Sequence, residues 1–378
     1  MKPDALAILR VEIFGVAIPL IGAGFKNAYI TKKVQKSAIV RLTATDGSIG
    51  LGNIDPSPGY STETIEQSLD ALRHTLAGTV QGLDAGNPHR VVEAMDAALD
   101  GFLDAKAAVE MACVDLTARR LGIPVHQYLG GALVETLRFN AWIGIEPPAV
   151  AAAEARRWFD RGFLSAKIKV GGGVDADRDR VMAVREAVGP VMKLRADANA
   201  GYSVEDGIRL GRLLEPFDMQ LLEQPVAAKD LAGMAKVRRS IGVKVMADES
   251  ITDHLSLIEV IRADCADIVK LKVMKQGGFL KCRRILETAS AAGLDVVIGH
   301  GFGLGVNTVA EIMLAATSRS VLEGLECVGP LKTADDIVRS KLDMTSGLIP
   351  LPTGPGLGVE LDEEKIRRYG FDQKDVHA

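Results

Sequence analysis

The chain has 378 residues and a formal net charge of −4, with 47% hydrophobic and 25% charged residues. This length exceeds what one hydrophobic core usually holds, so we expect two domains. No Lys/Arg-rich run and no basic stripe interleaved with aromatic residues is present, which argues against nucleic acid as a partner.

The four cysteines stand far apart, at positions 113, 265, 282 and 327. Their spacing matches neither a CxxC metal pair nor a dense disulfide pattern, so we expect reduced thiols in the core. The N-terminus carries Asp4 and Glu12 in place of the long apolar region of a signal peptide, and no apolar stretch reaches membrane-spanning length. The sequence therefore predicts a soluble, cytoplasmic protein without a membrane partner.

The N-terminal part begins with alternating apolar residues. Residues 8–18 and 35–45 are predicted to be strands, and Asp46-Gly47 is a turn signal followed by a third short run that reaches Gly52. These segments predict a small antiparallel sheet.

Three helical stretches follow this sheet, at about 62–80, 89–99 and 104–121. The last is expected to end at Gly122 and Pro124, because glycine caps a helix and proline prevents its continuation. Residues 1–130 are therefore predicted to form an α+β domain.

From about residue 139 short apolar runs alternate with helical segments, a pattern typical of a parallel sheet built from βα units. We expect strands near 138–144, 166–170, 192–197, 219–223, 243–248, 267–272, 295–300 and 321–326. Eight strands are the number of a (β/α)₈ TIM barrel, so residues 131–345 are predicted to be a barrel catalytic domain. After Gly/Pro-rich residues 346–358, the tail to residue 378 is expected to complete the α+β domain, which caps the barrel.

Seven of these strands end in an ionisable residue, and successive ends are 24 to 28 residues apart, which is one βα unit per step. The residues are Lys169, Asp197, Glu223, Asp248, Lys272, His300 and Glu326. Barrel enzymes place their chemistry at this rim, because loops there vary without disturbing the packed interior. The alternative is that polar residues simply cap the strands.

Three carboxylates, Asp197, Glu223 and Asp248, end consecutive strands, and like charges so close favour a cation at their centre. Oxygen ligands without cysteine or histidine indicate Mg²⁺, with Mn²⁺ as the alternative. Strand alternation aims Asn199 the same way as Asp197, so Asn199 would orient a ligand or a metal-bound water, or else cap a turn. By the same rule Glu249 should point away from the metal.

Lysines flank the predicted metal site. Lys167 and Lys169 face the same side of one strand, an arrangement that depresses ammonium pKa values and suits a general base. Lys272 ends a strand roughly across the barrel mouth, so two bases would face opposite sides of a substrate. The proton α to a metal-bound carboxylate would leave through an enediolate intermediate.

Six segments together resemble the enolase superfamily, and specifically its mandelate-racemase/muconate-lactonizing-enzyme family (muconate-lactonizing branch). They are Lys167-Ile168-Lys169, Arg195-Ala196-Asp197-Ala198-Asn199, Leu222-Glu223-Gln224-Pro225, Ala247-Asp248-Glu249-Ser250, Lys272-Val273-Met274-Lys275-Gln276-Gly277-Gly278 and Glu326-Cys327-Val328-Gly329-Pro330. The resemblance implies that the three carboxylates hold the metal, that Lys169 and Lys272 are acid/base residues, and that Lys167 supports Lys169. It also implies an acidic role for Glu326 and a homo-oligomer.

The resemblance further implies that loops around residues 22–29 and 52–60 of the first domain close over the barrel mouth. Phe25, Tyr29 and Asp55 are then candidates for substrate specificity. The alternative for each is an ordinary exposed loop residue.

Two positions depart from the pattern. Lys270 lies on the same face as Lys272, where it would tune Lys272, bind a substrate anion, or form a buried ion pair. His300 is a second base or a substrate-binding or supporting group. The segment from Glu326 to Val328 lacks the acidic-x-Asp pair associated with dipeptide epimerases, which argues against a dipeptide substrate.

The leading hypothesis is a Mg²⁺-dependent isomerase of a small carboxylate: a racemase or epimerase of an amino-acid derivative, or a muconate-type cycloisomerase. The second is a dehydratase of an acid sugar or hydroxy amino acid that uses the same enediolate. A ligand-binding barrel without activity is the third, and it leaves both lysines without a purpose.

Overall fold

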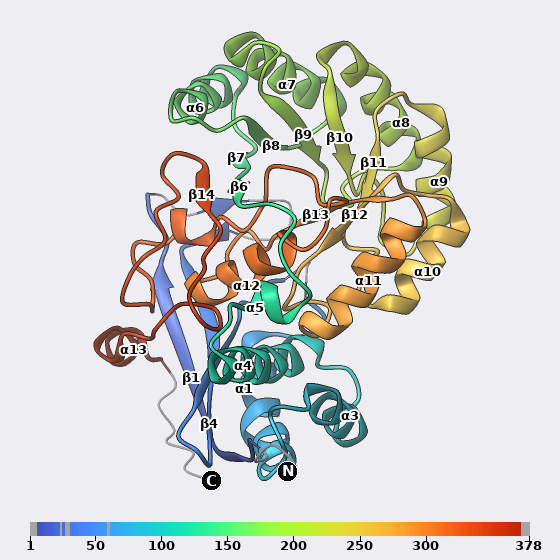
Figure 1. Ribbon diagram of the computed structural model, residues 1–378. Helices are drawn as coiled ribbons and strands as arrows, with labels where there is room; N and C mark the ends of the chain where they lie inside the picture. Colours follow the sequence, from blue (N-terminus) through green and yellow to red (C-terminus); the bar gives the residue numbers. More distant parts are fainter. Residues whose placement is uncertain (1–5, 23–24, 27–30, 59–60, 372–378) are drawn as a thin grey trace.

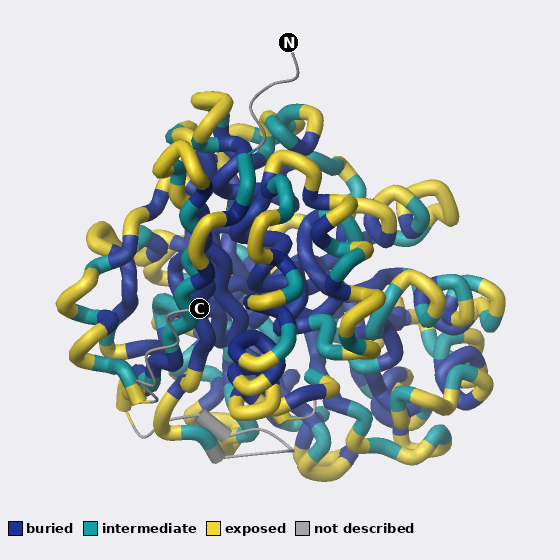
Figure 2. The backbone as a smooth tube through the Cα atoms, turned by 90° about the horizontal axis from the view of Figure 1, so that it is seen from below, coloured by how far each residue is buried: buried dark blue, intermediate teal, exposed yellow. Residues whose placement is uncertain are grey.

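The computed structural model describes residues 6–22, 25–26, 31–58 and 61–371, with the backbone alone at residues 25, 26 and 31. Figure 1 shows a small sheet with its helices below a larger curved sheet that is flanked by helices. The fold is an α/β barrel with an N-terminal α+β cap, which agrees with the predicted fold class. Buried backbone fills the centre of the molecule, and exposed backbone lies on the outer turns (Figure 2).

The cap is built on an antiparallel sheet in the order β1-β4-β5. Its strands are β1 (Ile8–Pro19), β4 (Val34–Ala44) and β5 (Ile49–Ile54), with a separate short pair β2 (Phe25–Lys26) and β3 (Thr31–Lys32). The predicted turn joins β4 to β5, because Gly47 adopts a φ of +84° and Asp46 accepts a hydrogen bond from the Ser48 amide at 2.9 Å. The three strands confirm the predicted sheet.

Six helical segments follow this sheet in the described part of the chain. They are α1 (Ile65–Ala71), a π-helical segment η1 (Leu72–Leu76), α2 (Ala77–Val80), α3 (Pro88–Ala98), α4 (Leu103–Leu121) and α5 (Val125–Tyr128). Of these, α4 and α1 contact the strands of the sheet. Helix α4 lies so close to β5 that a Cβ added at Gly52 would stand 1.8 Å from the Ala108 carbonyl oxygen. The helix ends at Gly122, which has a φ of +70°, as the glycine signal predicts.

Seven parallel strands form the curled sheet of the barrel within the described part of the chain, in the order β13-β12-β11-β10-β9-β8-β7. The strands are β7 (Ala141–Ile143), β8 (Ser165–Lys169), β9 (Lys193–Asp197), β10 (Met219–Glu223), β11 (Val245–Ala247), β12 (Ile268–Leu271) and β13 (Asp295–Ile298). The connecting helices are α6 (Pro148–Asp160), α7 (Val174–Val188), α8 (Val204–Leu214), η2 (Glu215–Phe217), α9 (Leu231–Ser240), α10 (His254–Ala263), α11 (Phe279–Ala291) and α12 (Gly305–Ala315).

The predicted eighth strand, residues 321–326, is not a regular strand. It forms single parallel bridges to Val296 of β13 and to Phe139 before β7, and thereby closes the ring. Two of its carbonyl oxygens accept hydrogen bonds from the Arg195 guanidinium, at 2.6 and 2.8 Å, and Gly324 has a φ of +89°. The segment still forms backbone hydrogen bonds to β13 and to residues 138 and 140 on either side of the carbonyl oxygens that bind Arg195.

The C-terminal part returns to the cap after a short turn η3 (Gly329–Leu331). Strand β14 (Leu348–Pro350) pairs with β6 (Thr136–Arg138), and helix α13 (Glu363–Tyr369) packs against β1. Figure 1 shows α13 beside the cap sheet. The domain boundaries themselves stay a prediction.

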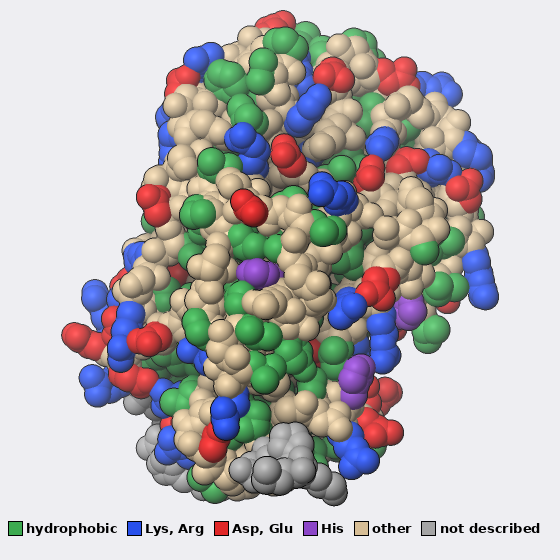
Figure 3. Space-filling view, in the orientation of Figure 1, with side chains coloured by type: hydrophobic (Ala, Val, Ile, Leu, Met, Phe, Trp, Pro, Cys, Tyr) green, Lys and Arg blue, Asp and Glu red, His purple; other side chains and the backbone are tan. Residues whose placement is uncertain are grey.

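All four cysteines are buried free thiols, which confirms the expectation of reduced thiols in the core. Among the described residues, none of the helices is both long and apolar enough to cross a membrane. Acidic and basic side chains are interspersed on the face drawn in Figure 3.

Candidate active site at the barrel rim

The strand register brings the predicted rim residues side by side. Lys169 of β8 is paired with Asp197 of β9, and Asp197 is paired with Glu223 of β10. Asp248 directly follows β11, and Lys272 directly follows β12. All five are buried, so charged groups from five consecutive strands lie at one end of the barrel, where barrel enzymes carry their active sites.

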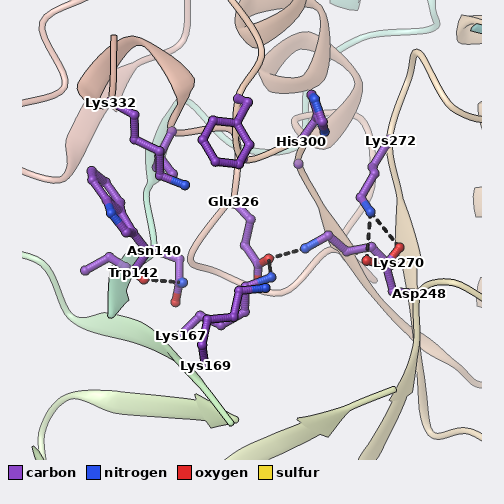
Figure 4. A pocket seen from close by; sticks show the side chains of 15 residues that line it. Asn140, Trp142, Lys167, Lys169, Asp248, Lys270, Lys272, His300, Glu326 and Lys332 are labelled. Atoms are coloured by element: carbon purple, nitrogen blue, oxygen red, sulfur yellow. Dashed lines mark hydrogen bonds and ion pairs between the residues drawn. The ribbon is translucent and has the colours of Figure 1, made fainter. Parts of the chain in front are cut away.

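Each of the two predicted bases is hydrogen-bonded to a different carboxylate. The Lys169 ammonium donates to Asp197 at 2.5 Å and to the Asn199 side-chain oxygen at 2.8 Å. The Lys272 ammonium donates to both oxygens of Asp248, at 2.6 and 2.7 Å (Figure 4). The two amines therefore reach the cavity from separate strands and are held by separate acids.

Lys167 lies one pleat below Lys169 and bridges several carboxylates. Its ammonium is 3.1 Å from Asp197, 3.1 Å from Glu223 and 2.5 Å from Glu326. It thus fixes two of the three predicted metal ligands from beneath, which is a supporting position for Lys169.

Glu326 is the centre of a buried ionic cluster under the rim. Besides Lys167 it binds the Lys270 ammonium, and it accepts from the Arg195 guanidinium at 2.9 Å. Burial opposes ionisation of Glu326, but Lys167, Lys270 and Arg195 outweigh it and hold its pKa well below the usual range. In the structure Lys270 forms a buried ion pair, which is one of the three possibilities considered for it.

A divalent cation fits the chemistry of the rim carboxylates. Burial, followed by the charge of Asp197, raises the pKa of Glu223 to about 8, as expected where carboxylates are crowded without a cation. Within the described ranges, however, no three acidic, histidine or cysteine side chains converge closely enough to hold an ion. Instead, the ammonium groups of Lys169 and Lys272 form ion pairs with Asp197 and Asp248. These ion pairs would have to break for a metal to bind.

Two residues of this rim were not identified by strand alternation. Glu249 was expected to point away, yet its carboxylate accepts a hydrogen bond from Asn199 at 3.2 Å. The expectation was wrong because β11 ends at Ala247, so the alternation rule no longer applies. Gln224, in a left-handed conformation, accepts from the backbone amide of Asp248 at 3.0 Å and so orients that loop. The only sequence signal for either was membership in a matching segment.

His300 lies in the cavity wall and contacts the cap. Its Nε2 is 2.9 Å from the backbone oxygen of Asp55. Burial, and then the charge of Lys272, lowers the pKa of His300 well below its ordinary value. The His300 ring therefore links the cavity wall to the cap through the Asp55 backbone.

The three cap residues considered for specificity have different outcomes. Asp55 is fully buried, accepts hydrogen bonds from Ser37 and Asn307, and does not belong to the cavity lining. It is therefore not the exposed loop residue that was considered. The side chain of Phe25 and all of Tyr29 lie outside the described residues.

A cavity joins these groups at the centre of the rim (Figure 4). Its wall combines the lysine and carboxylate groups with two aromatic rings and several small residues. The lining residues are Asn140, Ala141, Trp142, Lys167, Lys169, Asp248, Lys270, Lys272, Gly299, His300, Gly301, Phe302, Glu326, Val328 and Lys332. Both candidate bases and one candidate metal ligand thus share one space.

Both parts of the chain match described families. Residues 10–130 match the family described as "Mandelate racemase / muconate lactonizing enzyme, N-terminal domain". Residues 150–365 match the family described as "Enolase C-terminal domain-like".

Characterised relatives are similar over nearly their whole length. The chain is 31% identical to an L-Ala-D/L-Glu epimerase of Bacillus subtilis, covering 94% of this chain and 97% of the relative. It is 30% identical to a chloromuconate cycloisomerase of Cupriavidus pinatubonensis, covering 90% and 93%.

Solved structures show the same architecture. An N-succinyl Arg/Lys racemase from Bacillus cereus superposes with a TM-score of 0.92 at 29% identity, covering 96% of this chain and 98% of that one. A dipeptide epimerase from Enterococcus faecalis, complexed with Mg and the dipeptide L-Leu-L-Tyr, superposes with a TM-score of 0.89 at 30% identity, covering 93% and 99%.

Proposed function

Because this chain belongs to the mandelate racemase/muconate lactonizing enzyme family of the enolase superfamily, we propose that Lys169 and Lys272 are the acid/base pair with which it isomerises a small carboxylate. Relatives in this family are racemases, epimerases and cycloisomerases, so the enzyme is an isomerase of the superfamily. What remains to be assigned is which residues act and on what.

One observation carries the assignment of the bases. Lys169 and Lys272 line the same cavity, yet each is tied to a different carboxylate on a different strand. A substrate between them would present one face to each amine. One lysine would remove the α-proton, and the other would return a proton to the opposite face, which inverts the carbon centre.

Asp197, Glu223 and Asp248 would hold the divalent cation, which we take to be Mg²⁺, with Mn²⁺ as the alternative. Two solved dipeptide epimerases, each complexed with Mg, support this choice. Bound there, the cation would supply positive charge beside the substrate carboxylate. Lys169 and Lys272 would leave their carboxylates when the metal arrives and so become available to the substrate, while Lys167 keeps Asp197 and Glu223 in place.

Racemisation or epimerisation of an amino-acid derivative is the leading reaction, and cycloisomerisation is the second. Dehydration, with Lys272 or His300 as the acid, is the alternative from another enzyme class. It has less support, because the relatives are racemases, epimerases and cycloisomerases, and because burial lowers the pKa of His300, whose Nε2 is 2.9 Å from a backbone oxygen. The reaction needs only a deprotonated lysine, a carboxylate substrate and a returning proton.

The test is α-proton exchange in D₂O, followed by NMR, on N-acyl, N-alkyl and hydroxy amino acids and on muconates. Exchange without loss of water supports racemisation, whereas a keto or unsaturated product would assign the site to dehydration. With the true substrate, Lys169→Ala and Lys272→Ala should each abolish racemisation, and each should retain exchange of one enantiomer only. Lys193→Ala, an exposed lysine at the start of β9, is the control and should behave as the unsubstituted enzyme. Normal turnover in both active-site variants would refute the assignment.

We also propose a cytoplasmic homo-oligomer that acts on a small molecule and binds neither nucleic acid nor membranes. Four buried, unpaired thiols suit a reducing compartment. Light scattering of the purified protein tests the oligomeric state, and a monomer would contradict it.

A further inference from the structure

We propose that Asp177, Arg180 and Tyr202 form a clamp that positions the backbone of Lys169, one of the two proposed bases, and that Lys272 does not depend on this clamp. The inference rests on the proposed function, in which the two lysines act on opposite faces of a substrate. It assigns a role to three side chains that do not belong to the cavity lining.

Arg180 of α7 binds the backbone at the point where β8 ends. Its guanidinium donates a hydrogen bond to the backbone oxygen of Lys169 at 3.2 Å and another to the backbone oxygen of Glu146 at 2.6 Å. Glu146 follows β7, so one buried side chain joins the loop after β7 to the end of β8. Arg180 also donates to Asp177. Because the guanidinium is planar and its donors point in fixed directions, it holds these three acceptors in one arrangement.

Asp177 binds the loop that follows Lys169. One of its carboxylate oxygens accepts hydrogen bonds from the amides of Gly171, Gly172 and Gly173, at 2.8, 2.9 and 3.1 Å. Gly171 and Gly173 have φ values of +110° and +123°, which L side chains rarely adopt. Glycine therefore allows three consecutive amides to converge on one buried carboxylate, which fixes the backbone from the second residue after Lys169.

Tyr202 connects this loop to the next two strands. Its hydroxyl donates to the same carboxylate oxygen of Asp177 and accepts from the Gly171 amide at 2.9 Å. Its own amide donates to the backbone oxygen of Pro225 at 3.1 Å. Burial, and then the hydrogen bond to Asp177, raise the pKa of Tyr202 above its ordinary value, so the hydroxyl keeps its proton and remains a donor. The loops after β8, β9 and β10 are thus held together through Asp177 and Tyr202.

Lys169 needs such a support because the proposed function breaks its ion pair. Its ammonium is bound to Asp197 at 2.5 Å and to Asn199 at 2.8 Å, and a metal at Asp197 would remove the first of these contacts. The place of the amine would then depend more on the backbone, which the clamp fixes. A displacement of about 1 Å at a reacting group can lower a rate about 100-fold. The clamp acts through the backbone of Lys169, so its members are positioning residues rather than catalytic ones.

The backbone of Lys272 has a support of its own. Its amide donates to the side-chain oxygen of Gln276 at 2.7 Å, and the side-chain nitrogen of Gln276 donates to the backbone oxygen of Ile251 at 3.1 Å. Strands β8 and β12 lie on either side of the strands that carry the rim carboxylates. The two bases can therefore be perturbed one at a time.

The first experiment measures α-proton exchange in D₂O with one base acting alone. In Lys272→Ala only Lys169 remains, and in Lys169→Ala only Lys272 remains. Addition of Tyr202→Phe should lower the exchange rate by about 10–100-fold in the first background and by less than about twofold in the second. Gln276→Ala should show the opposite pattern. Tyr369→Phe, which also removes a hydroxyl that donates to a carboxylate but lies on α13, is the matched control and should change neither rate.

A second substitution in the clamp guards against a folding defect. Arg180→Lys keeps the positive charge but loses the planar set of donors, so it too should lower exchange in the Lys272→Ala background alone. Circular dichroism checks that each variant is folded. An equal loss in both backgrounds would show that the clamp only stabilises the barrel and would overturn its role in positioning Lys169. No loss in the Lys272→Ala background would overturn it as well.

The second experiment needs no substrate and therefore separates the clamp from the proposed function. Crystals of the unsubstituted enzyme and of Tyr202→Phe, both grown with Mg²⁺, are compared. The backbone at Lys169 should be displaced by more than about 0.5 Å in the variant, whereas the backbone at Lys272 should coincide in the two structures. An undisplaced Lys169 would overturn the clamp. If Lys169 moves but the unsubstituted enzyme exchanges no α-proton with any substrate, the proposed function fails and the clamp stands.

Discussion

The ionic cluster around Glu326 predicts a large effect of one isosteric substitution on stability. In Glu326→Gln the side chain keeps its shape but loses the charge that binds Lys167, Lys270 and Arg195. Lys167 retains two other carboxylates, and Arg195 retains carbonyl oxygens near the eighth strand. Lys270, at 1% exposure, has Glu326 as its hydrogen-bond acceptor among the described residues. Its charge therefore loses its hydrogen-bonded counterion and keeps only the weaker attraction of Glu223 and Asp248.

Removal of one member of a buried ion pair typically costs about 3–5 kcal/mol, because the remaining charge has no counterion. We expect Glu326→Gln to lower the free energy of unfolding by roughly this amount. Lys270→Met alone should cost less, about 1.5–3 kcal/mol, since Glu326 keeps Lys167 and Arg195. In the double variant the stranded charge is gone, so the two costs should fall short of additive by about 0.5–3 kcal/mol.

Urea unfolding followed by circular dichroism, without added metal, measures all three variants. Glu186→Gln, an exposed glutamate on α7, is the matched control and should change stability by less than about 0.5 kcal/mol. The reasoning is refuted if Glu326→Gln stays within about 1 kcal/mol of the unsubstituted protein, or if the two single costs simply add.

Three further predictions concern the rim and the cap. Chelation of the divalent metal should abolish proton exchange but lower the Tm by only about 5 °C or less, because Lys169 and Lys272 then neutralise two of the ligands. Calorimetry with and without EDTA measures the change in Tm, and global unfolding in EDTA would contradict the prediction. Gln224→Ala should cost about 2–4 kcal/mol in unfolding experiments and weaken Mg²⁺ binding by about 10–100-fold, since the Asp248 amide loses its acceptor; unchanged metal affinity would show that Gln224 does not position the loop. Burial raises the pKa of Asp55 to about 7, above its unfolded value, so the folded state binds the proton more tightly and stability should fall as pH rises from about 4 to 7. Denaturation at several pH values should show a shallower fall of the unfolding free energy in Asp55→Asn. Equal slopes of this free energy against pH in the two proteins would contradict the prediction.

Much of the fold was accessible from the sequence because the signals are local. Apolar runs bounded by turn residues located the cap strands and the seven regular barrel strands, and Gly122 located the end of α4. The eighth strand was the exception, since two of its carbonyl oxygens bind Arg195, which lies far away in the sequence. The first predicted barrel strand was too long for a similar reason, since residues 136–138 pair with β14 from the C-terminal part.

The prediction of side-chain positions at the rim was limited in the same way, because these positions depend on three-dimensional structure as well as on the local sequence. Strand ends could be placed to within a residue or two, which is enough to bring Lys169, Asp197 and Glu223 together. It is not enough to orient Glu249, because one residue beyond the end of β11 the alternation of side chains is replaced by loop geometry. The position of Lys332 in the cavity wall could not be predicted from the sequence for a stronger reason: nothing near residue 332 indicates that Trp142 and Phe302 will surround it.

The partner of each buried lysine is what separates the roles in this cavity. Lys270 meets Glu326, a carboxylate already bound by two other cations, so its charge is fixed and it stabilises the barrel. Lys169 and Lys272 form ion pairs with carboxylates that are candidate ligands of a divalent cation, so metal binding would release their amines toward a substrate. Lys332 lies between two aromatic rings, which also attract an ammonium. The same residue type therefore has three different surroundings within one cavity, and the sequence alone does not tell them apart, because the distinction lies in contacts made across the barrel.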